Sequence, residues 1–180
     1  MIVASVRIAV ALLAALALAP AALTYQQPQK LRDVAHVYSL GVGDVRCAKA
    51  TEWDEDFASS FSWGYTNLRD DYVVLGPTAC EGALAVGRAT VPAWQQALGI
   101  LVLTHEAFHL RHWRHRRNEG KVECQAMVYF REAAQRLGAT AAQADDLYAY
   151  ALALHDYKVR LFPQYGYRRC IYPPWRPPSD

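Results

Sequence analysis

LTHEAFHLRHWRHRRNEGKVEC, residues 103–124, places His105 and His109 four residues apart, with Glu106 between them. The segment before it, PAWQQALGILV from Pro92, is apolar at helical spacing, so we expect one long, mostly buried helix to run through both histidines. On a helix, side chains four residues apart lie on one face, about one turn from each other. Both imidazoles can therefore hold one metal ion, and Glu106, offset by one position, can reach the open side of that ion.

This His-Glu-x-x-His spacing is the arrangement that holds zinc in metalloproteases. The metal lowers the pKa of its bound water to about 7, and the glutamate takes a proton from that water. We therefore expect Zn²⁺ on His105 and His109, with Glu106 as general base and later proton donor. His112 and His115 lie among arginines just downstream, and we interpret them as part of a solvated basic turn.

A catalytic zinc site usually has three protein ligands and one open position. Glu119 and Glu123 lie four residues apart on the next predicted helix, so both carboxylates point to one side of it. Either carboxylate has the chemistry of a third ligand.

Residues 103–127 resemble the gluzincins, the thermolysin-like branch of the zinc metallopeptidases. In that branch the ligand glutamate is followed four residues later by an acid that hydrogen-bonds a ligand histidine. The resemblance implies that Glu119 is the ligand and Glu123 fixes an imidazole tautomer, with the reverse assignment as the alternative. This chain has glutamate where thermolysin-like sequences have aspartate. Only nine residues separate His109 from Glu119, so the chain must turn back sharply after the first helix.

The resemblance also implies an α+β, zincin-like fold, with a long active-site helix, following helices and a small sheet. The chain is similar, too, to small exported bacterial metallopeptidases with no assigned substrate. Its implied function is zinc-dependent hydrolysis of a peptide or protein substrate. Two hypotheses compete with it: a non-catalytic, zinc-stabilised module that binds a partner at the cell envelope, and a disulfide-braced binding domain without a metal.

A hydrogen-bond donor opposite the zinc would stabilise the oxyanion that develops during hydrolysis. The candidates lie downstream of the second helix and are His155, Tyr157, Tyr165 and Tyr167. A disulfide between Cys124 and Cys170 would bring residues 162–170 beside that helix, which favours Tyr165 or Tyr167.

Cys47, Cys80, Cys124 and Cys170 are an even number of cysteines in a chain that looks exported, and this predicts two disulfides. Four cysteines allow three pairings. We favour Cys47 with Cys80 and Cys124 with Cys170, because each pair closes within one half of the chain.

The N-terminal segment predicts export. Residues 1–21 contain one cation, Arg7, followed by an apolar run and small residues, as in a signal peptide. If this leader is not cleaved, residues 1–23 are long enough to anchor the protein in a membrane. Residues 22–45 then form a linker and N-terminal segment, 46–170 the metallopeptidase domain, and 171–180 a proline-rich tail. The expected location is secreted or extracytoplasmic, with membrane contact only through an uncleaved leader.

Removal of the leader lowers the formal charge of +2 by one, since it takes away only Arg7. A nearly neutral chain gives no case for nucleic acid as a partner. We expect a monomer.

Further helices and one strand are predicted around the motif. A helix over 31–40 ends at the Gly41 and Gly43 pair, and residues 71–75, DYVVL, form a strand. We expect this strand to be the sheet edge along which a peptide substrate lies.

Two helices follow the motif. Asn118 caps one of them, which ends at Gly138 with a buried stripe of Val122, Ala126, Tyr129, Ala133 and Leu137. Thr140 begins the other with a capping box to Gln143 and a buried stripe of Leu147, Tyr150, Leu154, Tyr157 and Leu161.

Overall fold

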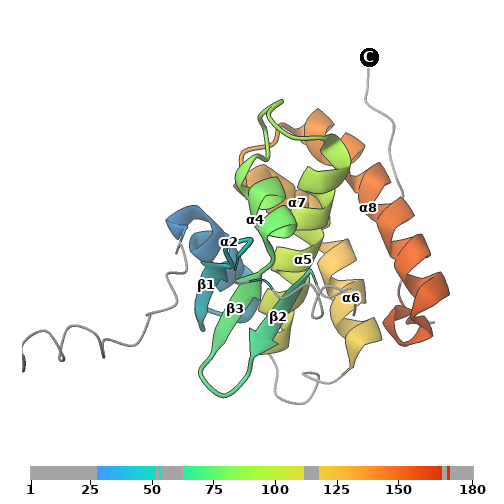
Figure 1. The fold of residues 1–180 in the computed structure, drawn as a ribbon. Helices are drawn as coiled ribbons and strands as arrows, with labels where there is room; N and C mark the ends of the chain where they lie inside the picture. Colours follow the sequence, from blue (N-terminus) through green and yellow to red (C-terminus); the bar gives the residue numbers. More distant parts are fainter. Residues whose placement is uncertain (1–27, 52, 54–62, 112–117, 168–169, 171–180) are drawn as a thin grey trace, which may run out of the picture.

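The computed structural model describes residues 28–51, 53, 63–111, 118–167 and 170 (Figure 1). Within them the chain has an α+β fold with six α-helices and one three-stranded sheet, which confirms the expected class. The elements are α2 (Gln29–Ser39), β1 (Asp44–Cys47), β2 (Gly64–Asn67), β3 (Tyr72–Leu75), α4 (Pro77–Leu84), α5 (Ala93–Arg111), α6 (Glu119–Val128), α7 (Phe130–Arg136), α8 (Ala141–Leu161) and the 3-10 helix η1 (Pro163–Tyr165).

Helix α5 runs through the middle of the molecule, with the sheet and α2 to one side and α6 and α8 to the other (Figure 1). Every residue from Gln95 to Leu110 is buried, as expected for the helix that carries the His-Glu-x-x-His motif. Such a helix tolerates a polar side chain only where that side chain has a partner. Thr104, for example, donates to the carbonyl of Ile100 at 2.8 Å.

The sheet has the order β1-β3-β2, with β1 parallel and β2 antiparallel to β3. The predicted strand at 71–75 is confirmed as β3, but its expected place at the sheet edge is wrong. It is the central strand, and its backbone groups are shared between two neighbours, so no peptide can be added to it. The edge that faces α5 is β2, a four-residue strand that the sequence analysis did not predict.

Glycine is required where β2 lies on α5. A Cβ atom on Gly64 would stand 2.6 Å from Val102 Cγ1 and 3.0 Å from the carbonyl oxygen of Val74. The absence of a side chain therefore lets the edge strand approach the motif helix closely.

One hydrophobic core joins the helices to the sheet, and it includes residues from Leu31 to Ala151. Helix α2 contributes Leu31, Val34 and Tyr38 to this core. The core therefore includes α2, which precedes residue 46.

The caps of the helices after the motif agree with the predictions. The side chain of Asn118 accepts from Lys121 N at the start of α6, and Thr140 with Gln143 forms the expected capping box of α8. The single predicted helix up to Gly138 is instead interrupted at Tyr129, whose φ and ψ are −95° and 4°. Tyr129 is exposed, and the buried side chain at this break is Phe130.

The predicted face of α8 is right for Leu147, which is buried, and for Leu154, which is partly buried against the core, but wrong for its other three residues. Tyr150, Tyr157 and Leu161 are exposed, whereas the buried residues are Ala144, Leu147, Tyr148, Ala151 and His155. The true face includes a buried histidine, which a search for apolar residues alone does not count.

Two disulfides brace the fold in the favoured pairing. Cys47 at the end of β1 pairs with Cys80 on α4, with their Cα atoms 5.7 Å apart. Cys124 on α6 pairs with Cys170, at a Cα–Cα distance of 5.6 Å. Disulfides of this kind are typical of an oxidising, extracytoplasmic environment.

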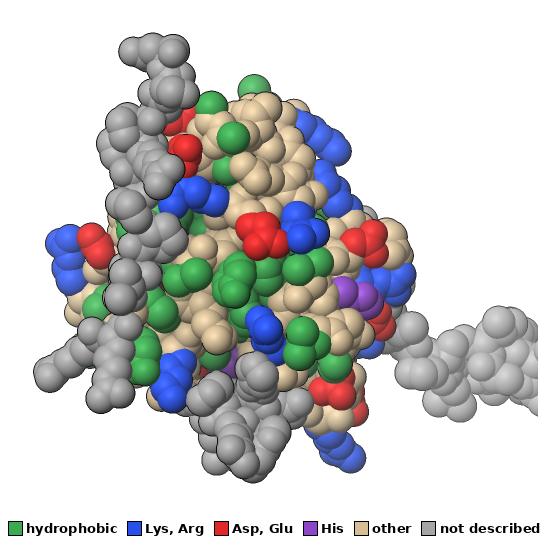
Figure 2. Space-filling view, turned by 180° about the vertical axis from the view of Figure 1, so that it is seen from behind, with side chains coloured by type: hydrophobic (Ala, Val, Ile, Leu, Met, Phe, Trp, Pro, Cys, Tyr) green, Lys and Arg blue, Asp and Glu red, His purple; other side chains and the backbone are tan. Residues whose placement is uncertain are grey.

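Lys and Arg side chains are interspersed with Asp and Glu on the face opposite to that of Figure 1, without a continuous field of one sign among the coloured residues (Figure 2). None of the helices in the described ranges is both long and apolar enough to cross a bilayer. The leader and the proline-rich tail, residues 1–21 and 171–180, lie outside the described residues.

Candidate metal centre

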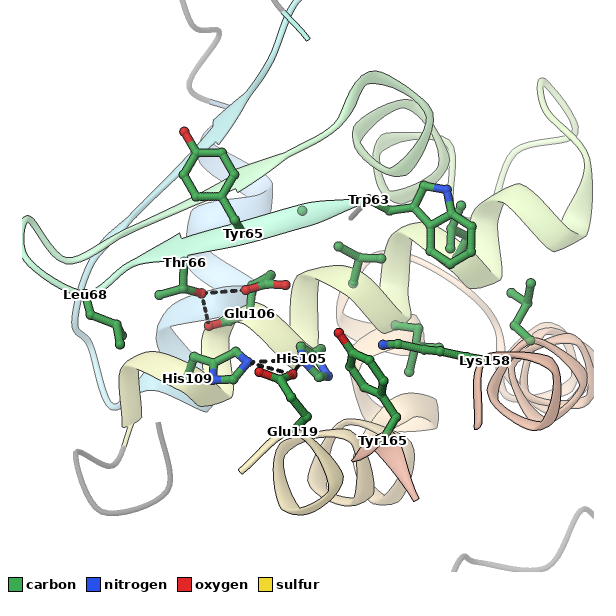
Figure 3. Close-up of a pocket in the computed structure, with 15 residues that line it drawn as sticks. Trp63, Tyr65, Thr66, Leu68, His105, Glu106, His109, Glu119, Lys158 and Tyr165 are labelled. Carbon is green, nitrogen blue, oxygen red and sulfur yellow. Dashed lines mark hydrogen bonds and ion pairs between the residues drawn. The ribbon is translucent and has the colours of Figure 1, made fainter. Parts of the chain in front are cut away.

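Three donor atoms from two helices converge at one point (Figure 3). His105 Nε2 lies 3.1 Å from His109 Nε2 and 3.0 Å from Glu119 Oε2, and His109 Nε2 lies 3.4 Å from the same oxygen. These three residues form a group that could hold a metal ion, and it is called the metal group below. Two imidazole nitrogens at 3.1 Å need a proton or a cation between them, because each otherwise presents a lone pair to the other.

The triangle has the dimensions of a metal site. With bonds of about 2.0 to 2.1 Å, tetrahedral zinc separates its ligand atoms by about 3.3 Å. Helix α5 supplies the two histidines on consecutive turns, and the Asn118 cap makes Glu119 the first residue of α6. A carboxylate in the first turn of a helix also interacts favourably with the helix dipole.

Glu123 lies on the other side of His105. Its Oε2 is 2.6 Å from His105 Nδ1, and its side chain is completely buried. A carboxylate beside Nδ1 favours the tautomer that leaves Nε2 free to bind a metal. The geometry therefore favours Glu119 as the third donor and Glu123 as its supporting partner over the reverse assignment.

Two residues of α8 reach the same carboxylate. Lys158 Nζ donates to Glu123 Oε2 at 3.0 Å, and His155 Nδ1 lies 3.3 Å from Glu123 Oε1. His155 is thus placed behind the metal group and is not among the described residues that line the cavity.

Burial, hydrogen bonds and charge together shift the pKa of His105, Glu119 and Glu123. Burial and the Lys158 charge lower the pKa of His105, but the carboxylates of Glu119 and Glu123 outweigh them and raise it to about 9. Burial raises the pKa of Glu119, but hydrogen bonds with His105 and His109 hold it far below its usual range. Glu123 behaves in the same way, since burial is outweighed by hydrogen bonds with His105 and His155 and by the charge of Lys158.

Glu106 points away from the three donors, toward the sheet (Figure 3). The hydroxyl of Thr66, on β2, is 2.7 Å from Glu106 Oε2 and 2.9 Å from the Glu106 carbonyl oxygen. A hydroxyl has one hydrogen, and the carboxylate is the stronger acceptor. Thr66 therefore ties the motif glutamate to the edge strand.

A cavity of about 270 Å³ opens beside the donors. One of its walls consists of β2 and its neighbours, and the donors with Glu106 form another. The residues of the first wall are Trp63, Gly64, Tyr65, Thr66 and Leu68. Its apolar side consists of Leu98, Leu101, Val102 and Leu154. The cavity thus joins polar groups to an apolar pocket, as small-molecule and substrate sites do.

Tyr165 is the one of the four candidate oxyanion donors that is placed at the metal group. Its ring centroid is 5.8 Å from that of His105, and the side chain lines the cavity. Burial and the nearby carboxylates of Glu119, Glu106 and Glu123 raise the pKa of Tyr165, so its hydroxyl remains a hydrogen-bond donor at neutral pH. Tyr157 is exposed on α8, and neither Tyr157 nor Tyr167 is among the described residues that line the cavity.

The sequence analysis missed three residues of the site: Thr66, Trp63 and Lys158. Thr66 and Trp63 belong to a short strand segment without a strong pattern, and Lys158 follows the predicted stripe of α8 by one position. The interval of three residues between His155 and Lys158, which places both on one face of the helix, was the available signal. The predicted basic turn with His112 and His115 lies outside the described residues.

Comparison of the chain with protein-family models, with curated proteins and with solved structures gives no match.

Proposed function

We propose that the chain is a zinc-dependent peptidase of the zincin type, exported from the cytoplasm, that hydrolyses peptide bonds. The observation that carries the proposal is the triangle of His105, His109 and Glu119 with Glu106 beside it in the same cavity. Two imidazoles and one carboxylate are a ligand set of catalytic zinc. The same set also suits Fe(II), but Glu106, a carboxylate that lines the same cavity and is not one of the three donors, favours hydrolysis.

A zinc ion on these donors would polarise the substrate carbonyl and make an adjacent water more acidic. Glu106 would accept a proton from the attacking water and pass it to the nitrogen of the leaving amine. Thr66 would hold one carboxylate oxygen of Glu106, which leaves the other for the water. The Tyr165 hydroxyl would donate a hydrogen bond to the developing oxyanion.

Strand β2 offers a way to hold the substrate. It is an edge strand that lines the cavity, so an extended peptide could pair with its backbone while a side chain enters the apolar pocket. A preference for apolar side chains next to the cleaved bond follows from Leu98, Leu101 and Val102.

The proposal is tested with the Glu106→Gln variant, which keeps the size of the side chain and removes its basicity. We expect unchanged zinc content and a fall in kcat of about 10²- to 10⁴-fold, measured on a library of quenched fluorescent peptides. Equal activity in variant and wild type would remove Glu106 from the mechanism. If the wild-type protein binds zinc and cleaves no peptide, the non-catalytic binding module becomes the better hypothesis.

A further inference from the structure

The Glu123 carboxylate contacts two side chains besides that of His105, the histidine that it orients. One oxygen, Oε2, faces both His105 Nδ1 at 2.6 Å and Lys158 Nζ at 3.0 Å. The other, Oε1, faces His155 Nδ1 at 3.3 Å. His155 and Lys158 lie three residues apart on α8 and so point from one face of this helix. The carboxylate is held from α5 on one side and from α8 on the other.

A fully buried carboxylate is costly unless a cation compensates its charge. Lys158 supplies a permanent cation here: its side chain is 17% exposed, whereas that of Glu123 is 0% exposed. Among the described residues that line the cavity, Lys158 is the one Lys or Arg. Three carboxylates, those of Glu106, Glu119 and Glu123, surround the centre. One divalent metal ion together with Lys158 would balance them.

Lys158 also contacts the cavity side of the site. Its Nζ lies 3.7 Å from the centroid of the Tyr165 ring, close enough for a cation–π interaction. In Figure 3 the Lys158 side chain extends toward Tyr165, beside the metal group. The ammonium group of Lys158 therefore contacts both Glu123, which supports His105, and Tyr165, which lines the cavity.

We propose that Lys158 is a positioning residue of the metal centre: its ammonium group fixes the Glu123 carboxylate against His105 and the Tyr165 ring over the cavity. The inference rests on the metal-binding part of the proposed function and does not depend on hydrolysis. It assigns to α8 a role that neither the motif nor the paired glutamates predict.

Zinc affinity, measured by competition with a chelator, tests this role. We expect Lys158→Met to weaken zinc binding by about 10- to 100-fold, the usual effect of losing a residue that orients a metal ligand. Lys158→Arg keeps the positive charge and should recover part of the loss. The matched control is Arg160→Met, which removes a cation from an exposed position of the same helix and should leave affinity unchanged.

A double-mutant cycle separates positioning through Glu123 from general packing. In a Glu123→Gln background there is no carboxylate for Lys158 to fix, so adding Lys158→Met should change zinc affinity by less than about twofold. A further loss as large as in the wild-type background would overturn the proposal. The cobalt-substituted forms give a second readout, since the d–d absorption bands should shift in Lys158→Met and remain as in the wild type in Arg160→Met.

If Lys158→Met does not fold, the comparison of Glu123→Gln with the double variant still decides, because neither of these leaves the fully buried Glu123 carboxylate without its cation. Equal affinities support the proposal, and a weaker double variant contradicts it. If the wild type binds zinc and Lys158→Met binds it equally well, only this inference fails. A wild type that binds no zinc contradicts the proposed function itself.

Discussion

At the scale of single residues, the Glu106 carboxylate is anchored by one hydrogen bond from the edge strand. Thr66 donates to Glu106 Oε2 at 2.7 Å, and nothing in the His-Glu-x-x-His motif predicts this contact. A hydrogen bond to a charged group contributes about 1.5 to 3 kcal/mol, more than a bond between neutral groups. The orientation of the proposed base therefore depends on a residue about 40 positions upstream in the chain.

Replacement of Thr66 by valine keeps the shape of the side chain and removes the donor. We expect Thr66→Val to lower kcat by about tenfold or more with unchanged zinc content, because the carboxylate loses its anchor while the three metal donors stay in place. Steady-state kinetics and elemental analysis measure the two quantities. Thr66→Ser, which keeps the hydroxyl, is the control and should retain most of the activity. Equal rates for the valine and serine variants would show that the hydrogen bond has no role.

The raised pKa of His105 predicts how zinc affinity depends on pH. In the metal-free protein, Glu119 and Glu123 raise this pKa to about 9 against burial and Lys158, so His105 carries a proton at pH 7 that zinc must displace. As pH rises from 7 to 9 the competing proton is lost, and zinc affinity should increase about tenfold per pH unit before it levels off. Chelator competition across this range measures the slope. An affinity that is constant from pH 7 to 9 would contradict the assignment of His105.

At the scale of elements, the close contact between α6 and η1 places Tyr165. A Cβ atom on Gly120 would stand 2.7 Å from the carbonyl oxygen of Gly166 and 3.1 Å from that of Gln164. Both are backbone atoms, so a side chain at Gly120 must push η1 away from α6. The Cys124–Cys170 disulfide joins the same two segments.

We expect Gly120→Ala to displace Tyr165 and to lower kcat by up to about a hundredfold, since small errors in position are costly at a catalytic site. Zinc content should not change. Glu119 lies in the same turn of α6 as Gly120, but its side chain takes no part in the contact between Gly120 and η1. The control is Lys121→Ala, the next residue on α6, with kcat and zinc measured for both variants. Unchanged kcat in Gly120→Ala would argue that Tyr165 does not act on the substrate.

The elements also show what the sequence could predict. Helix α5, the Asn118 cap and the Thr140 capping box follow from local patterns, and all three are present. The buried face of α8 was not predictable from apolar spacing. One of its inward positions is His155, whose burial depends on Glu123, a residue 32 positions away in the chain.

The sheet was predicted least well for a related reason. Strand β3 is central and apolar, so VVL identifies it, but β2 is a short edge strand, GYTN, with little apolar pattern of its own, although it pairs with the next strand in the chain. Which strand faces the motif helix depends on the order β1-β3-β2, and no local pattern specifies that order. The predicted site residues His105, Glu106, His109 and Glu119 needed no such information, because they lie within 15 residues on two adjoining helices.

At the scale of the whole molecule, the metal group lies where the parts of the fold meet. Helix α5 contacts each of the other α-helices among the described residues as well as β2 and β3, and both disulfides fix segments that adjoin it. Metal binding is therefore expected to be coupled to the integrity of the entire core rather than to one loop. This makes metal content the most direct readout of the proposed centre.

The decisive measurement is the number of zinc and iron atoms per chain, by elemental analysis of the oxidised protein and its His109→Ala, Glu119→Ala and Glu123→Ala variants. We expect about one zinc in the wild type, loss of zinc in His109→Ala and Glu119→Ala, and retained but weaker binding in Glu123→Ala. A well-folded wild-type protein without zinc would contradict the proposed centre and would leave His-Glu-x-x-His as a coincidence in a histidine-rich helix.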